Sequence, residues 1–205
     1  MRVLTTGEFF DELHMKAPFY LVALTICLHG FLPKAIMSPL KAGFMPSKFS
    51  SRISWREKLT RQQEAKIVDI PPRMQARFGK GKMLIPKPLD VDKLIRRVPE
   101  GKLATVLQLR EELAKRSNVD VACPLCTGIF VRISAEAAEE ERRAGKKSVT
   151  PYWRVISSEG RLNPTYPGGA TRQRRMLCAE GHKVVRATGK KAPAVANFEG
   201  ALVRF

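Results

Sequence analysis

The sequence predicts a mainly α-helical protein with small β elements. Apolar residues recur at helical spacing in several stretches between residues 90 and 180, and short extended stretches bounded by proline and glycine lie among them. The chain has 205 residues, of which 44% are hydrophobic, so it is long and apolar enough to bury a core. Its formal net charge of +18 favours a polyanionic partner: DNA, RNA or an anionic membrane surface.

Residues 1–53 are expected to form an N-terminal extension and linker, which need not be ordered. An apolar stretch within it is short for a membrane span, and the acidic residues before that stretch are wrong for a signal peptide, so no membrane association is expected. A helical arm is predicted over residues 54–89. In this arm Ser54 caps one short helix, Gly79 ends a second, and residues 82–85 form a strand.

The main domain is predicted over residues 90–187. Asp90 is expected to cap its first helix, Thr105 to open the second, and Pro124 to lie in the first turn of the third. The expected apolar positions of these helices are Val91, Leu94, Ile95 and Val98, then Leu109 and Leu113, then Ile129, Ile133 and Ala137. Two helices joined by a short connection on a basic chain suggest a helix-turn-helix.

The chain after the third helix is predicted to hold an extended stretch, a helix and two closing strands, at residues 149–156, 171–179, 184–185 and 195–198. Residues 188–205 are expected to be a C-terminal strand and tail. The only acidic run of this basic chain comprises Glu136 and Glu139 to Glu141. Because DNA is polyanionic, this run is expected to face away from it.

The chain has four cysteines, which are too few for a disulfide scaffold, so reduced thiols and a cytoplasmic location are expected. The only metal alternative is a zinc site made of Cys123, Cys126, Cys178 and His182. Its two halves are 51 residues apart, far beyond the spacing of a usual zinc finger. We therefore interpret these residues as small core residues and expect neither a metal nor a cofactor.

Five short patterns surround the predicted helix-turn-helix in a fixed order: residues 98–105 (VPEGKLAT), 150–156 (TPYWRVI), 160–162 (GRL), 166–169 (YPGG) and 180–182 (EGH). This order resembles the C-terminal domain of the O6-alkylguanine-DNA alkyltransferases, which reads I-P-x-G-K-V-x-T-Y-G, P-C-H-R-V, G-x-L, Y-x-G-G and L-L-x-x-E-G. The resemblance covers residues 90–185. It implies a winged helix-turn-helix-like domain that binds double-stranded DNA.

The sequence departs from that family where the chemistry takes place. In the family, the cysteine of P-C-H-R accepts an alkyl group from a flipped guanine, and the histidine and a glutamate draw off its proton. Tyr152 stands at the cysteine position, Trp153 at the histidine position, and Glu180 at the glutamate position. Alkyl transfer is therefore not expected. The resemblance places a degenerate pocket at Pro151, Tyr152, Trp153, Arg154, Tyr166, Gly168, Gly169 and Glu180.

Two DNA-handling positions also differ from the family. Val106 replaces a tyrosine that presses on a phosphate, and Leu125 replaces an arginine that enters the space left by the flipped base. Tyr152 and Trp153 could offer a stacking surface for a base, with core packing as the alternative. The candidate DNA-binding residues are Thr105, Val106, Leu125, Thr127, Gly128, Arg172, Arg174 and Arg175. For the arginines the alternative is a solvated helix face.

The sequence thus favours a non-catalytic, monomeric DNA-binding protein, with alkylated or distorted bases as candidate targets and other repair proteins as candidate partners. One alternative is a structural or protein-interaction module that kept the fold and lost DNA. The other is an alkyltransferase that uses Cys126 or Cys178 as its acceptor.

Overall fold

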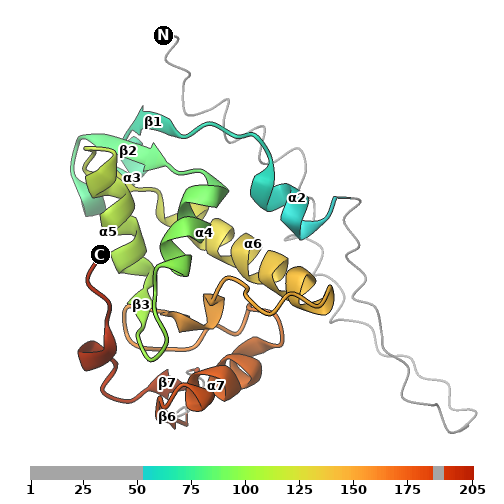
Figure 1. Cartoon of the computed structure of the whole chain (residues 1–205). Coiled ribbons are helices and arrows are strands. Elements are labelled where there is room, and N and C mark those ends of the chain that lie inside the picture. Colours follow the sequence, from blue (N-terminus) through green and yellow to red (C-terminus); the bar gives the residue numbers. More distant parts are fainter. Residues whose placement is uncertain (1–52, 187–191) are drawn as a thin grey trace, which may run out of the picture. The chain divides into compact units, whose positions relative to one another are not determined.

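The computed structural model describes residues 53–186 and 192–205 (Figure 1). The N-terminal extension and the first part of the tail therefore lie outside the described residues. The architecture is mainly helical with three small sheets, as the sequence predicts. In chain order the elements are α2 (Trp55–Thr60), β1 (Lys66–Asp69), α3 (Pro72–Phe78), β2 (Lys82–Ile85), α4 (Pro88–Arg96), β3 (Ala104–Thr105), α5 (Val106–Arg116), β4 (Val121–Ala122), α6 (Pro124–Arg143), the 3-10 helix η1 (Tyr152–Arg154), β5 (Val155–Ile156), α7 (Gly169–Ala179), β6 (Val184–Val185), β7 (Ala194–Val195) and the 3-10 helix η2 (Phe198–Ala201).

The residues predicted as an arm share a sheet with the main domain. β1 pairs with β2 in antiparallel fashion, and β2 pairs with β4 in parallel, so the sheet order is β1-β2-β4. Strand β1 was not predicted from the sequence. The remaining sheets are β3-β5, which is parallel, and β6-β7, which is antiparallel.

Among the described residues α6 is the longest helix, and α2 and α4 pack along it (Figure 1). The predicted face of α4 is confirmed, since Val91, Leu94 and Ile95 are completely buried. For α6 the prediction was right for Ala137, which is buried, but wrong for Ile129, which is exposed, and for Ile133, which is only half-buried. The inward face of α6 is instead built from small and aromatic residues, namely Cys126, Thr127, Phe130, Val131, Ser134, Ala135, Ala137 and Ala138.

A second core cluster is closed by the C-terminal segment. Its buried residues are Leu103, Ile156, Leu162, Leu177 and Val195, and Trp153, Phe198 and Leu202 pack against it. The backbone of Leu103 donates to the carbonyl oxygen of Ala201 and accepts from the N–H of Val203, at 2.9 and 2.8 Å. Residues 192–205 are therefore an integral part of the domain.

Four elements differ from the prediction in their bounds or type. Asp90 does not cap α4, which begins two residues earlier because Pro88 suits the first helical position, where no N–H is needed. The stretch predicted as extended over 149–156 contains η1 before β5. Helix α7 starts at Gly169 rather than residue 171, because Gly168 adopts the left-handed conformation (φ 74°) and sets its entry. The last closing strand, predicted over 195–198, is β7 followed by η2.

Candidate functional site: a helix face and a filled pocket

Helices α5 and α6 form the predicted pair of helices with a short connection (Figure 1). Thr105 begins α5 with a capping box. The Thr105 side chain accepts from the backbone N–H of Gln108, and the Gln108 side chain accepts from the backbone N–H of Thr105. β4 lies within the connection, and Pro124 opens α6 as expected. The local sequence thus fixes both helix starts.

The N-terminal half of α6 presents one uncovered face, which we call the α6 face: Leu125, Gly128, Ile129 and Arg132. Leu125 is 56% exposed and Ile129 is 37% exposed, so this face presents two large apolar side chains to solvent. These positions recur at intervals of three and four, so they share one side of the helix. Of the four, only Leu125 and Gly128 were predicted from the sequence to bind DNA, and Ile129 was predicted to face the core.

Two candidate DNA-binding residues have structural roles instead. Thr105 is buried as the cap of α5. Thr127 is completely buried, and its hydroxyl donates to the carbonyl oxygen of Cys123 at 2.8 Å. Both side chains are thus engaged inside the domain, and contact of these residues with DNA stays a prediction. Val106 is half-buried.

The acidic side chains at the other end of α6 are engaged in contacts within the domain. Glu140 accepts from the backbone N–H groups of Trp55 and Arg56 at 3.0 and 2.9 Å, and so holds the start of α2. Glu141 forms ion pairs with Lys146 at 2.9 Å and Arg96 at 3.8 Å. The run was expected to face away from DNA, and the structure shows that much of it is neutralised within the domain.

Glu139 is the centre of what we call the Glu139 cluster. It is 3% exposed and accepts from the Tyr152 hydroxyl at 2.8 Å. Arg142 donates to it at 3.0 Å and Arg172 at 2.7 Å. Burial, followed by this hydrogen bond to the carboxylate, raises the pKa of Tyr152 far above its usual range. The phenol therefore stays protonated at neutral pH.

Glu180 is the centre of a second group, the Glu180 cluster. It accepts from the Trp153 indole at 2.6 Å and from Arg154 Nη2 at 2.8 Å. Arg154 also donates to the carbonyl oxygen of Val98 at 2.7 Å, which ties the cluster to the turn before β3. Burial favours the neutral acid, but the bonds from Arg154 and Trp153 outweigh it and hold the pKa of Glu180 below its ordinary value.

The place where the family resemblance puts a pocket is filled. Tyr152 is completely buried, and its ring meets the edges of Trp153 and Tyr166 at centroid distances of 5.5 and 5.6 Å. Pro151 is buried as well. Tyr152 thus has no exposed face on which a base could stack, so core packing, the alternative interpretation, describes it correctly. Trp153 is half-buried.

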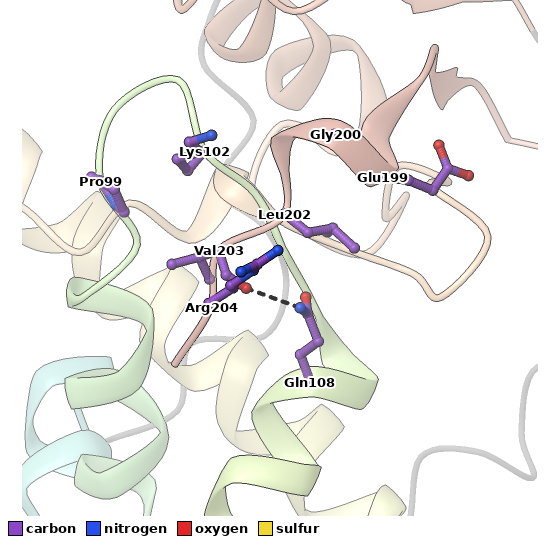
Figure 2. Close-up of a pocket in the computed structure, with 8 residues that line it drawn as sticks. All are labelled: Pro99, Lys102, Gln108, Glu199, Gly200, Leu202, Val203 and Arg204. Atoms are coloured by element: carbon purple, nitrogen blue, oxygen red, sulfur yellow. Dashed lines mark hydrogen bonds between the residues drawn. The ribbon is translucent and has the colours of Figure 1, made fainter.

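A solvent-open hollow of about 660 Å³ lies elsewhere, between the turn before β3, the start of α5 and the C-terminal segment (Figure 2). Its lining residues are Pro99, Lys102, Gln108, Glu199, Gly200, Leu202, Val203 and Arg204. None of the eight predicted pocket residues lines it. Within it the Gln108 side chain donates to the carbonyl oxygen of Val203 at 3.0 Å (Figure 2), so part of its polar lining is already engaged.

The three candidate arginines of α7 have different environments. Arg174 and Arg175 are exposed, whereas Arg172 is drawn into the Glu139 cluster. Gly168 makes this possible, because a Cβ there would lie 2.6 Å from Cδ of Arg172. Gly169, another of the predicted pocket residues, is the first residue of α7.

The residues of the zinc alternative are not gathered. Cys123 and Cys126 are buried at the start of α6, while Cys178 is exposed on α7. Within residues 53–186 and 192–205, no three histidine, cysteine or acidic side chains are arranged to hold a metal ion. The helices of these same residues are all too short or too polar to cross a membrane.

Two solved structures match part of the chain. One is S. pombe Atl1 in complex with damaged DNA containing O6-carboxymethylguanine, with 18% identity and a TM-score of 0.40. The other is S. pombe ATL in complex with DNA, with 17% identity and a TM-score of 0.39. Each match covers 57% of this chain and 94% of the other. No protein-family model matches the chain, and no curated protein does. A likeness at this level assigns neither a family nor a function.

Proposed function

We propose that this protein binds duplex DNA without catalysis, through the α6 face and the exposed arginines Arg174 and Arg175. The observation that carries the proposal is the division of α6. Its N-terminal half leaves Leu125 and Ile129 uncovered beside Arg132, while the acidic side chains of its other half are largely engaged inside the domain. The first half of such a helix can approach a polyanion. The acidic side chains of the second half repel the polyanion only weakly, because their charges are already paired within the domain.

The absence of catalysis is proposed from the state of Tyr152. Its hydroxyl is buried, protonated and hydrogen-bonded to Glu139, so it is neither exposed to an alkylated base nor activated as a nucleophile. Trp153 next to it cannot accept a proton as a histidine does. Mass spectrometry of the protein after incubation with O6-methylguanine DNA should show no alkyl adduct. An adduct on Cys126 or Cys178 would favour the alternative of a rescued alkyltransferase.

The proposed binding mode does not need a flipped base. Because Tyr152 packs against both Trp153 and Tyr166 where the resemblance would place a flipped base, duplexes with and without O6-methylguanine should bind with dissociation constants within about twofold. A preference of tenfold or more for the modified duplex would show that this packing opens, and would restore lesion recognition as the function.

Salt dependence of the dissociation constant is the first test. If four to six phosphates are neutralised, log K should fall with log salt concentration with a slope of about −4 to −5. The double variant Arg174→Ala/Arg175→Ala should flatten that slope by about one to two units. Arg172→Ala is the matched control, because Arg172 already pairs with Glu139. This variant should change the slope by less than about half a unit. Equal effects of both variants would argue against the proposed role of Arg174 and Arg175.

The α6 face has its own matched pair of variants. Leu125→Ala should weaken duplex binding by roughly 1–2 kcal/mol at fixed salt, if its side chain is covered in the complex. Leu107→Ala removes a comparably exposed leucine from α5, outside the α6 face, and should leave binding unchanged. If neither variant alters binding and no salt-dependent complex forms, the chain is better described as a protein-interaction module that kept the fold.

A further inference from the structure

The start of α6 contains two cysteines that the proposed DNA-binding function does not use. Cys123 is the residue immediately before the helix, and Cys126 is its third residue, with Pro124 and Leu125 between them. Both are buried and neither is in a disulfide. Residues three apart at a helix start have Cβ atoms about 5–6 Å apart. A disulfide needs about 3.5–4.5 Å, so closing the pair requires only a small local shift.

The surroundings distinguish the two thiols. A hydrogen bond from the Cys126 thiol, opposed by burial and supported by the N–H groups of the first helical turn, lowers the pKa of Cys123 to about 6. The same interaction and burial raise the pKa of Cys126. Cys123 is thus the thiolate and Cys126 keeps its proton.

A cation stands close to the thiolate. Arg110 of α5 donates through Nε to the carbonyl oxygen of Ala122, directly before Cys123, at 3.1 Å. Its guanidinium lies 5.4 Å from the ring centroid of Phe78, and its charge further favours the ionised Cys123 sulfur. A cationic neighbour and a helix start are conditions that lower the pKa of a cysteine in this spacing.

We propose that Cys123 and Cys126 are a reversible dithiol–disulfide pair, with Cys123 as the attacking and Cys126 as the resolving thiol. The co-reactant is a small-molecule disulfide. The Cys123 thiolate attacks one of its sulfurs, that S–S bond breaks, and one thiolate leaves. Cys126 then loses its proton to solvent and attacks the Cys123 sulfur, which releases the second thiolate. The protein gives up two electrons and the small disulfide is reduced to two thiols.

The test uses the full chain and oxidised glutathione. After exposure over a series of reduced-to-oxidised glutathione ratios, free thiols are blocked with N-ethylmaleimide and tryptic peptides are weighed. Cleavage after Arg116 and Arg132 leaves both cysteines in the single peptide 117–132. This peptide should lose two hydrogens and take up no N-ethylmaleimide once the buffer is oxidising, and dithiothreitol should reverse the change.

Variants separate the two roles. Cys126→Ala should trap glutathione on Cys123, because the resolving thiol is gone. It should also move the midpoint of Cys123 alkylation upward by about one pH unit or more from the wild-type value near 6, since the hydrogen bond from Cys126 is lost. Cys178→Ala removes an exposed thiol of α7 and should leave the 117–132 peptide unchanged.

Two results would overturn the proposal. One is a peptide 117–132 that carries two N-ethylmaleimide groups at every glutathione ratio. The other is a wild-type protein in which glutathione stays on Cys123, which would mean that Cys126 does not resolve the mixed disulfide. Neither readout involves DNA, so they are independent of the proposed DNA binding.

Discussion

The adjacent residues Tyr152 and Trp153 bind two different carboxylates, and the two clusters are built differently. The Glu139 cluster has a carboxylate side chain that is only 4% exposed, with three donors, of which Arg142 and Arg172 are 37% and 31% exposed. In the Glu180 cluster both charged partners are largely covered, with Glu180 at 9% and Arg154 at 13% side-chain exposure. The first cluster has two arginines near solvent, whereas the second depends on a single, largely covered arginine.

This difference has a consequence for stability. A buried charge that loses its partner is costly, whereas a charge that keeps other partners or can reach water is not. Removing one arginine should therefore have unequal effects in the two clusters. Measurements of unfolding free energy can test this, because each cluster offers an arginine and an aromatic donor to remove.

The largest expected effect is that of Arg154→Met. It leaves Glu180 with only the Trp153 indole and the Gly101 N–H, and it removes the bond to the Val98 carbonyl oxygen. We expect a loss of about 3–5 kcal/mol in the free energy of unfolding, measured by urea denaturation at pH 7. Arg172→Met is the matched control and should lose only about 1–2 kcal/mol, because Arg142 and Tyr152 still bind Glu139. Equal losses would contradict the contrast between the clusters.

A smaller effect is expected for Glu180→Gln, and it depends on pH. The folded-state pKa of Glu180 lies below its unfolded value of about 4.3, so the carboxylate stabilises the folded state above that pH. This contribution is lost as the pH falls through the folded pKa. The variant should therefore be less stable than the wild type by about 2–3 kcal/mol at pH 7, with the gap closing on acidification. A gap that stays constant from pH 7 to pH 3 would show that Glu180 acts by packing alone.

The next effect is that of Tyr152→Phe, which removes one neutral donor from Glu139 and keeps the ring. We expect a loss of about 1 kcal/mol, or a fall of roughly 2–4 °C in Tm, because both arginines remain. Trp153→Phe should cost more, since it removes the indole donor of Glu180 and also leaves the ring site underfilled. The reverse order would mean that Tyr152 is the more important donor.

The smallest effect is expected for Arg174→Ala and Arg175→Ala, which belong to neither cluster. Their side chains are exposed on α7, so each change should alter the unfolding free energy by less than about 0.5 kcal/mol. The same proteins should bind duplex DNA with a flatter salt slope, as proposed above. A clear loss of stability would show that these arginines support the fold.

Much of the local structure was predictable from the sequence. The caps at Ser54 and Thr105, the stop at Gly79 and the proline start of α6 depend on residues within one turn of each other, and the structure confirms them. Glu180 was singled out for its position, although its partners were not foreseen. Glu139 was noted only as part of an acidic run, because two of the side chains that it binds come from positions 13 and 33 residues further along the chain.

The sequence by itself determined the helical class, the helix starts and the excess of positive charge, because capping, turn chemistry and composition act over a few residues or over the whole chain. Only the tertiary structure decided which side of α6 is covered. The alanines and Phe130 are buried while Ile129 is exposed, because α2 and α4 pack close to that helix. It also decided that Tyr152 is core and Arg172 is paired, since both depend on bringing η1, α6 and α7 together. The role of each of these side chains therefore depends on neighbours that are distant in the sequence and that only folding brings into contact.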